Sequence, residues 1–398
     1  MNSPQTIDQA EGIQALSHHD TVFAQLLKLV PRHEFETLAN RHHSGQRLRR
    51  MTRWSQFIAM AMGQLTGRQS LRDIESHLAT QRRKLYHLGS AAVSRSSLSR
   101  VNERQPHELY ESLFHRLLRR CQGLAPRHGF RFKNKLYSLD ASTVDLCLSL
   151  FPWARFGTTK GAIKLHVGID HNGHLPAFVR ITDGKVHDIT AGRLLDLPKH
   201  SIVVFDRGYT DYAWFNQLNS KQLFFVTRLR KNARYRVVAR RAVDQSKGLT
   251  CDQTIELTGA KAANCPIRLR RVGYVDAETG QRYVFVTNHF DLAASTVAAI
   301  YKDRWQIELF FKWIKQNLKI KSFLGTSRNA VMTQIWIALC VYLLLAYLKF
   351  ASQLDRSLQQ ILRLLHLNLF ERRDLLALLR GDPPVPKISP HQTRLMFA

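Results

Sequence analysis

Four residues in the stretch YKDRWQIELFFKWIKQ have the types and spacing that chemistry on a phosphodiester needs. At offsets 0, 3, 7 and 14 the stretch carries Tyr301, Arg304, Glu308 and Lys315. At about 100° per residue these positions fall within one helical stripe roughly 60° wide. A carboxylate in that stripe can hold a divalent cation while Arg and Lys bind phosphate oxygens on either side. Lys312, on the same predicted helix, is a further candidate for binding DNA.

Two aspartates in strand-like runs can complete the site. Asp140 lies inside the apolar run SLDAST, and Asp206 ends the run VVFDRGY. An acid in a hydrophobic strand is costly unless a cation or hydrogen bonds compensate it. With Glu308, these acids form the minimum set of ligands for two Mg²⁺ ions about 3.5 to 4 Å apart. The alternative is that both are structural acids paired with neighbours such as Arg207.

Further polar residues between the two aspartates compete for the second position. Asp170 and Asp183 lie beside Gly-containing turns, and Asp188 is placed to cap a helix, which are common structural uses of Asp. His166 and His187 are alternative metal ligands or phosphate contacts, although a buried structural histidine is the commoner case. Asp206 is favoured over these acids because four apolar residues precede it and Arg-Gly-Tyr follows.

The region that holds these acids reads as an α/β domain. From Lys135 the apolar period becomes two, in the runs KLYSLDASTVDLCLS, AIKLHVGID, HLPAFVRITD and SIVVFDRG. Residues 171–173 predict a tight turn between the second and third runs, and VHDITAGRLLDLP predicts a helix before the fourth. Three antiparallel strands, a helical crossover and a further strand with an acid are the order of a ribonuclease-H-like sheet.

A β insertion is expected at 221–290, before a long helix that starts at Asp291 and includes the 301–315 stretch. Residues 221–282 hold 14 basic and 5 acidic residues. This imbalance favours phosphate binding over a solvated loop, with Arg228, Arg230 and Lys231 as the candidate contacts.

Residues 1–130 are expected to be an all-α DNA-binding region, because their apolar residues recur with a period of 3.6. Two helices around a turn at Gly89 would place Arg95 and Arg100 on the second helix, which Ser94, Ser96 or Ser97 can cap. That helix either enters a DNA groove or is an ordinary bundle helix with a solvated basic face. The catalytic domain is expected at 131–350, and residues 351–398 form an amphipathic helical tail.

Composition limits the partner and the compartment. The 398 residues include 59 Lys and Arg against 30 Asp and Glu, a net charge of +29, so the natural partner is a polyanion rather than a neutral ligand. The apolar run 335–348 has 14 residues, fewer than the roughly 20 a membrane span needs, which favours a core helix. Five dispersed cysteines without a C-x-x-C pair, and a polar N-terminus, favour a cytoplasmic protein.

The motifs LDAST and FDRGY, together with the Tyr-x2-Arg-x3-Glu-x6-Lys pattern of 301–315, resemble the DDE transposases of bacterial insertion sequences, in the family numbered four. The resemblance covers about 135 to 350. It implies a ribonuclease-H-like catalytic domain that depends on Mg²⁺, with Mn²⁺ as a substitute, and binding to terminal inverted repeats. By resemblance, Asp140, Asp206 and Glu308 are the metal ligands, and cut-and-paste transposition proceeds through hairpin ends. Tyr301, Arg304 and Lys315 would hold DNA phosphates, and a homodimer would bridge two paired ends near the nucleoid.

One departure from that family concerns the aromatic residue that receives a flipped base. Relatives typically use a Trp of the β insertion, but no Trp lies between Trp214 and Trp305 here. Any aromatic face can stack a base, so the alternatives are Tyr274, Tyr283, Phe285 and Trp305. Two rival functions remain: a related structure-specific nuclease, and a non-catalytic DNA-binding protein derived from a transposase.

Overall fold

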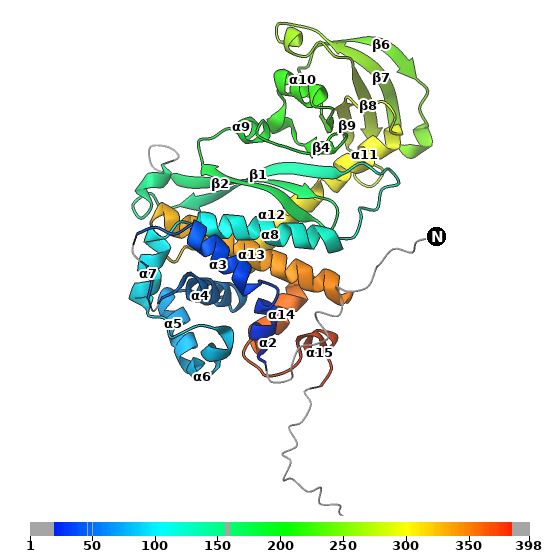
Figure 1. The fold of residues 1–398 in the computed structure, drawn as a ribbon. Coiled ribbons are helices and arrows are strands. Elements are labelled where there is room, and N and C mark those ends of the chain that lie inside the picture. Colours follow the sequence, from blue (N-terminus) through cyan, green and yellow to red (C-terminus); the bar gives the residue numbers. More distant parts are fainter. Residues whose placement is uncertain (1–19, 46, 50, 156–159, 384–398) are drawn as a thin grey trace, which may run out of the picture. The chain divides into compact units, whose positions relative to one another are not determined.

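The computed structural model describes residues 20–45, 47–49, 51–155 and 160–383 (Figure 1). The polar N-terminal stretch and the end of the C-terminal tail discussed above lie outside these ranges. The chain forms two compact units, unit 1 of residues 1–124 with 317–398 and unit 2 of residues 125–316. The division expected from sequence, at 130 and 350, therefore differs from the compact units at its second boundary.

Unit 1 is built from helices contributed by both ends of the chain. From the first part come α2 (Val22–Leu27), α3 (Arg32–Arg41), α4 (Arg53–Leu65), α5 (Leu71–Thr80), α6 (Arg82–Leu85), α7 (Arg95–Arg104) and α8 (Glu108–Leu124). From the second come α13 (Arg328–Ser352), α14 (Leu358–Asn368) and α15 (Leu375–Arg380). Of the three serines considered for the start of α7, Ser94 is the cap, since its hydroxyl accepts from the Ser97 N–H at 3.3 Å.

Helix α13 contains the apolar run 335–348. By length and composition alone α13 could cross a membrane, but 94% of its most apolar window is buried inside the protein. Helices α4, α7, α8 and α14 pack against it. The run is therefore the central core helix of unit 1, as its length indicated.

Unit 2 is organised around one mixed sheet. Its strands are β1 (Leu136–Leu146), β2 (Gly161–Asp170), β3 (Leu175–Asp183), β4 (Ile202–Phe205), β5 (Phe224–Arg228), β6 (Tyr235–Arg241), β7 (Leu249–Leu257), β8 (Leu269–Val275) and β9 (Arg282–Thr287). Its helices are α9 (Asp188–Gly192), α10 (Tyr212–Ser220), α11 (Ala294–Asp303) and α12 (Trp305–Asn317). The spatial order is β3-β2-β1-β4-β5-β9-β8-β7-β6.

The first five strands have the ribonuclease-H-like arrangement expected from the sequence. β1, β2 and β3 are antiparallel neighbours, and β4 and β5 run parallel to β1. The turn between β2 and β3 is at the predicted place, with Gly173 at φ 68°. Strands β6 to β9 of the insertion extend the same sheet, because β9 pairs with β5.

The sheet has a hydrophobic core on each face, which explains the continuous apolar run of β4. Val203 and Phe205 pack with Trp214 of α10 on one face. Ile202 and Val204 pack with Val297 of α11 on the other. Successive side chains of a strand point to opposite faces, so a strand covered on both sides is apolar at every position.

The long helix expected from Asp291 is two helices. α11 ends at Asp303 and α12 begins at Trp305, with Arg304 between them. The Arg304 N–H donates to the Tyr301 carbonyl at 3.3 Å, and the Ile307 N–H donates to the Arg304 carbonyl at 3.1 Å. These three-residue spacings tighten the turn. The 301–315 stretch is therefore not one uninterrupted helix, although Arg304 still contacts both the Tyr301 ring and Glu308.

The predicted crossover helix is also shorter than expected, with only the five residues of α9. Asp188 is not its cap, because the flanking residue is His187, which makes no side-chain cap. The Asp188 carboxylate instead pairs with Lys164 at 3.1 Å.

Candidate functional site

Strand register brings Asp140 and Asp206 to the same place. In the parallel pair β1–β4, Leu139 lies opposite Phe205, and the next residue on each chain is one of the two aspartates. Leu136 of β1 and Val204 of β4 face α11. Asp140 is four residues after Leu136 and Asp206 is two residues after Val204, so both aspartates point to the same face, because strand side chains alternate. The acids therefore lie beside each other on the α11 face, where the pairing of β4 with β1 ends.

Glu308 reaches the same place from the first turn of α12. The Arg304 guanidinium joins the groups, since it donates to Glu308 Oε1 at 2.5 Å and lies 3.5 Å from Asp140 Oδ2. The side chains of Arg304, Asp140 and Glu308 are 15%, 24% and 35% exposed. Asp140, Arg304 and Glu308 form one partly buried charged cluster, in which the cation touches two of the three predicted acids.

Electrostatics place Asp206 in that cluster. Burial raises the pKa of Asp140 to about 6, the Ala141 N–H and Arg304 lower it, and the negative charges of Asp206 and Glu308 raise it again. Because such repulsion decreases with distance, it indicates that Asp206 and Glu308 both lie near Asp140. Asp140 is thus a carboxyl whose charged form needs more positive charge than Arg304 alone supplies.

The alternative considered for Asp206, an ion pair with Arg207, is not what holds its carboxylate. Its Oδ1 accepts from the Gly208 N–H at 2.8 Å, and the Thr227 hydroxyl donates to its backbone carbonyl at 3.3 Å. Gly208 fits here because a Cβ at that position would lie 2.9 Å from Asp206 Oδ1. The FDRGY turn thereby fixes one carboxylate oxygen and leaves the other for a ligand.

The chemistry of these donors suits a hard divalent cation, although no group of three or more His, Cys, Asp or Glu side chains in the described ranges is arranged so that it could hold a metal ion. Arg304 occupies positive-charge contacts that a metal would take. The Tyr209 hydroxyl is buried near Asp188, Asp140 and Asp206 and has no hydrogen-bond partner within the described part of the chain. A buried polar atom without a partner, near the Asp140 carboxyl whose pKa is raised, fits a site that gains a cation and its water.

The competing polar residues have structural partners. Asp170 is fully buried and accepts from Lys135 Nζ at 2.9 Å. His166 is fully buried, with Nε2 3.0 Å from the Thr182 hydroxyl, so it cannot contact a phosphate. These contacts favour Asp206 as the second acid.

The remaining residues of the 301–315 stretch contact different parts of unit 2. Tyr301 packs on Phe285 with ring centroids 5.0 Å apart, and the Arg304 guanidinium lies 5.6 Å from its ring. Lys315 donates to the Thr143 carbonyl of β1 at 2.9 Å, three residues beyond Asp140. Lys312 is exposed on the same helix.

A basic pocket opens beside Asp206. It has a volume of about 220 Å³ and is lined by Arg207, Arg228, Arg230, Lys231, Arg271 and Arg282, without an acid among its lining residues. The structure therefore brings together the three residues predicted from the one-sided charge of the insertion. Arg271 and Arg282 were counted only in the charge of the insertion, because their meeting depends on the pairing of β8 with β9. Arg207 was considered only as a partner of Asp206.

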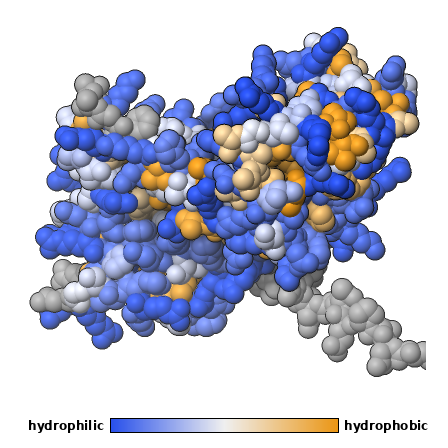
Figure 2. All heavy atoms as spheres, turned by 90° about the horizontal axis from the view of Figure 1, so that it is seen from above, coloured by the Kyte–Doolittle hydropathy of each residue, from blue (hydrophilic) through white to orange (hydrophobic). Residues whose placement is uncertain are grey.

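An aromatic pocket of about 380 Å³ adjoins Arg304 and Glu308. All four aromatic alternatives line it, namely Tyr274, Tyr283, Phe285 and Trp305. Phe285 is 2% exposed beneath Tyr301, and the Arg228 guanidinium lies 4.9 Å from the Tyr283 ring. Trp305 is 56% exposed, which makes it the ring most open to a partner. Figure 2 shows a mainly hydrophilic surface interrupted by hydrophobic patches.

Arg95 and Arg100 lie on α7 of unit 1, where both line a cavity described below. They belong to the other compact unit from Asp140, Asp206 and Glu308.

Comparison with known proteins adds family information to this geometry. Residues 131–344 match the family described as "Transposase DDE domain", and residues 18–91 match "Domain of unknown function (DUF4372)". "Putative transposase y4zB" of Sinorhizobium fredii is 35% identical over 313 residues, 75% of this chain and 85% of that protein. "Probable transposase for insertion sequence element IS5377" of Geobacillus stearothermophilus is 31% identical over 255 residues, 64% of this chain and 67% of that protein.

Among solved structures, a piggyBac transposase synaptic complex with hairpin DNA aligns with 92% of this chain and 81% of its own, at 8% identity and a TM-score of 0.43.

Proposed function

Because the chain belongs to the family of transposases with a DDE domain, we propose that it is a Mg²⁺-dependent insertion-sequence transposase of the family numbered four. In this proposal it binds terminal inverted repeats and cuts and joins DNA. Asp140, Asp206 and Glu308 are its catalytic carboxylates. The observation that carries the proposal is that these acids, distant in sequence, share one charged cluster with Arg304.

The three carboxylates would hold two Mg²⁺ ions, or Mn²⁺ in their place, which when bound activate the attacking water or 3′-hydroxyl and stabilise the leaving oxygen. The chain itself supplies position. The β1–β4 register sets the two aspartates, and α12 presents Glu308 toward them. Arg304 keeps the acids close without a ligand, and once released it can bind a phosphate oxygen as a charge-assisted donor.

DNA contacts would extend from this cluster along three groups of residues. The basic pocket supplies Arg228, Arg230 and Lys231 beside Asp206. The 301–315 stretch supplies Tyr301, Lys312 and Lys315 on the other side of Glu308. Arg95 and Arg100 of unit 1 are further proposed contacts to DNA. A protein that neutralises many phosphates binds DNA strongly and with a steep dependence on salt.

Hairpin formation at the cut end requires a tightly bent strand with an unpaired base. We assign the stacking of that base to Trp305, because its exposed ring lines the aromatic pocket together with Glu308. This assignment replaces the Trp of the β insertion that relatives use. The stacking residue is then the direct neighbour of Arg304 in the sequence.

The active assembly would be a homodimer across two paired ends, since joining both ends to a target uses two active sites. A protein that acts on DNA in a bacterium works in the cytoplasm, at the nucleoid. Both statements follow from the proposed reaction.

The deciding experiment compares Glu308→Ala with the control Glu278→Ala. Glu278 lines the same aromatic pocket but is 79% exposed and pairs with Lys302 at 3.2 Å. On DNA that carries the element's ends, Glu308→Ala should leave binding measurable and abolish cleavage in Mg²⁺, while Glu278→Ala cleaves normally. Cleavage retained by Glu308→Ala would remove Glu308 from the catalytic set.

The same reaction separates the rival functions. A structure-specific nuclease would cut ends but give no product joined to a target duplex. A transposase-derived binding protein would shift the DNA in Mg²⁺ or Mn²⁺ without cutting it. Joined products that require Asp140, Asp206 and Glu308 together exclude both.

A further inference from the structure

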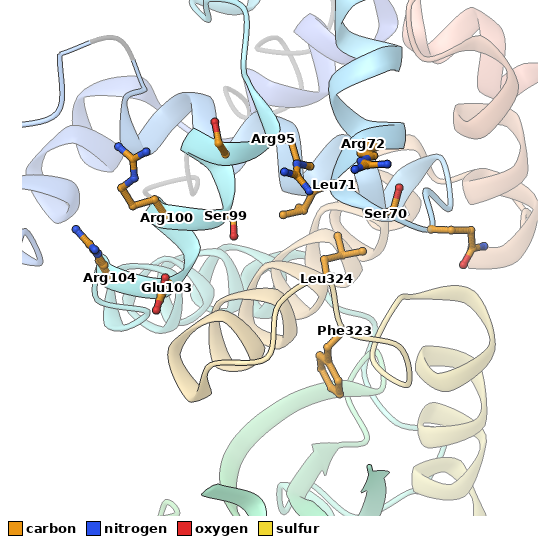
Figure 3. A pocket seen from close by; sticks show the side chains of 12 residues that line it. Ser70, Leu71, Arg72, Arg95, Ser99, Arg100, Glu103, Arg104, Phe323 and Leu324 are labelled. Atoms are coloured by element: carbon orange, nitrogen blue, oxygen red, sulfur yellow. The ribbon is translucent and has the colours of Figure 1, made fainter. Parts of the chain in front are cut away.

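Unit 1 contains a second basic cavity, which we call the arginine pocket. It has a volume of about 630 Å³ and is lined by residues of α5, of α7 and of the segment before α13. Its cations are Arg72, Arg95, Arg100 and Arg104, and its one acid is Glu103. Figure 3 shows Arg72 and Arg95, from different helices, near Leu71, with Phe323 and Leu324 on the opposite wall.

The four guanidinium groups have no hydrogen bond or ion pair with any side chain or backbone atom of the described residues, and all four residues are exposed. Other arginines of unit 1 are used structurally. Arg120 pairs with Glu34 at 2.5 Å, and Arg53 is buried and donates to the Pro106 carbonyl at 2.7 Å. Four unpaired cations around one hollow repel one another and are compensated best by a polyanion.

The helix that carries three of these arginines is held firmly by its other face. Leu98 and Asn102 are buried, and the Asn102 side chain accepts from Gln56 Nε2 at 2.7 Å. Asn329 Nδ2 donates to the Asn102 carbonyl at 2.8 Å. Arg100 and Arg104 are four residues apart, so they lie one above the other on the solvent side. The cations are therefore presented from a fixed framework, which reduces the entropy lost on binding.

The apolar wall is fixed as well. The Leu324 N–H donates to Gln334 Oε1 at 2.9 Å, and Gln334 is 1% exposed in α13. Phe323 and Leu324 thus form a partly buried apolar surface facing cations on α5 and α7. Arginines opposite an apolar surface match a sugar–phosphate backbone, whose charged oxygens and deoxyribose carbons alternate along the strand.

We propose that the arginine pocket of unit 1 binds the sugar–phosphate backbone of duplex DNA. Arg72, Arg95, Arg100 and Arg104 bind phosphate oxygens, and Phe323 and Leu324 pack against deoxyribose. This inference rests on the proposed function for its ligand, DNA. It gives α7 a role different from insertion into a groove, because phosphate contacts position a protein without reading bases.

The test removes the two arginines at the ends of the pocket and leaves Arg95 and Arg100 in place. The double variant Arg72→Gln with Arg104→Gln is compared with the control Arg119→Gln with Arg363→Gln, two exposed arginines of α8 and α14 outside the pocket. Both variants lose the same charge. Full-length protein in EDTA binds two labelled duplexes of equal length, one with the element's end and one unrelated, across 50 to 200 mM salt.

The pocket variant should show a log–log salt slope shallower by up to about two units, at about 0.9 per lost phosphate contact, by the same amount on both duplexes. The control should keep the wild-type slope. An unchanged slope in the pocket variant overturns the proposal, and a change on the end duplex alone also overturns it, because it indicates base reading. Equal melting temperatures show that the variants are folded.

Failure of this inference and failure of the proposed function give different results. The salt slope is measured without metal or cleavage, so it does not depend on Glu308. If Glu308→Ala still cleaves but the slope effect is present, the pocket stands and the catalytic assignment falls. If cleavage is abolished but the slope is unchanged, the reverse holds.

Discussion

Arg304 donates a hydrogen bond to Glu308 at 2.5 Å, four residues further along the chain, and so neutralises an acid of the proposed catalytic set. The other terminal nitrogen of the same guanidinium lies 3.5 Å from Asp140. The negative charge of Glu308 raises the pKa of Asp140, and Arg304 between the two carboxylates offsets that repulsion. A divalent ion binding to the same oxygens must compete with it.

That competition predicts a specific effect of Arg304→Gln. Without Mg²⁺ the variant should be less stable by about 1 to 2 kcal/mol, the low end for a hydrogen bond to a charged group because Glu308 is partly exposed. In millimolar Mg²⁺ its melting temperature should rise more than that of the wild type, because the carboxylates bind the ion without displacing a cation. Thermal unfolding with and without Mg²⁺ measures both effects.

Lys302→Gln is the matched control for charge and location. Lys302 is 63% exposed and lines the same aromatic pocket, but it pairs with Glu278 rather than with a catalytic acid. Its Mg²⁺-induced shift should equal that of the wild type. An Arg304→Gln shift no larger than this control would show that Arg304 and the metal do not share ligands.

A second prediction concerns the basic pocket. The double variant Arg230→Gln with Lys231→Gln should flatten the salt dependence of DNA binding by up to about one log–log unit for each lost phosphate contact. Arg228 is left intact, because it also contacts the Tyr283 ring. Binding titrations from 50 to 200 mM salt give the slope.

The control for that experiment is Arg236→Gln with Arg268→Gln. These exposed arginines of the same insertion already pair with Glu256, at 2.6 and 3.1 Å. They should contribute less to DNA binding for the same loss of charge. Equal slopes in the two double variants would mean that the basic pocket has no special role.

Stability should depend on pH through His166. Burial lowers the pKa of His166 to about 4, whereas an unfolded histidine titrates near 6.5. Between these values the unfolded chain binds a proton that the folded chain excludes, so the free energy of unfolding decreases as the pH falls from about 6.5 to about 4. The loss is at most about 3 kcal/mol, at 1.36 kcal/mol per pH unit.

Urea unfolding of the wild type and His166→Gln at pH 7.5 and pH 5 tests this. The variant should lose less stability between the two pH values than the wild type. His33→Gln, at an exposed position, should behave as the wild type. A pH dependence unchanged in His166→Gln would contradict the role of its burial.

Local sequence pattern was enough to predict features that lie within one strand or between two consecutive strands. The acids of LDAST and FDRGY stand out because charge interrupts apolar strands, and the short turn after Asp170 fixes how β2 meets β3. Both features depend on residues close together in the chain, where periodicity and turn chemistry are informative.

Features that depend on distant pairing were not visible in the sequence. The break at Arg304 occurs in residues of ordinary helix propensity, and it coincides with guanidinium contacts to Asp140, 164 positions earlier. The basic pocket needs Arg271 and Arg282 from two strands, and the neighbouring pairs of β7 contain register shifts. A one-residue shift would turn such side chains to the other face.

The last prediction concerns Trp305, whose ring is exposed in the aromatic pocket beside Glu308. If a base at the cut end stacks on it, Trp305→Ala should slow hairpin formation by about 5- to 150-fold, the equivalent of 1 to 3 kcal/mol per stacked base. Trp305→Phe keeps an aromatic face and should retain most of the rate. Single-turnover assays on a duplex nicked at the element's end measure this step directly.

Leu309→Ala is the control, because Leu309 is an exposed apolar residue of α12, 40% exposed, outside the lining of the aromatic pocket. Its hairpin rate should match that of the wild type. First-strand nicking should also be unaffected in Trp305→Ala, since that step acts on a stacked duplex and needs only the carboxylates. Equal loss of nicking and hairpin formation would show that Trp305 supports the fold of the site rather than a flipped base, and one of the tyrosines would then be the stacking residue.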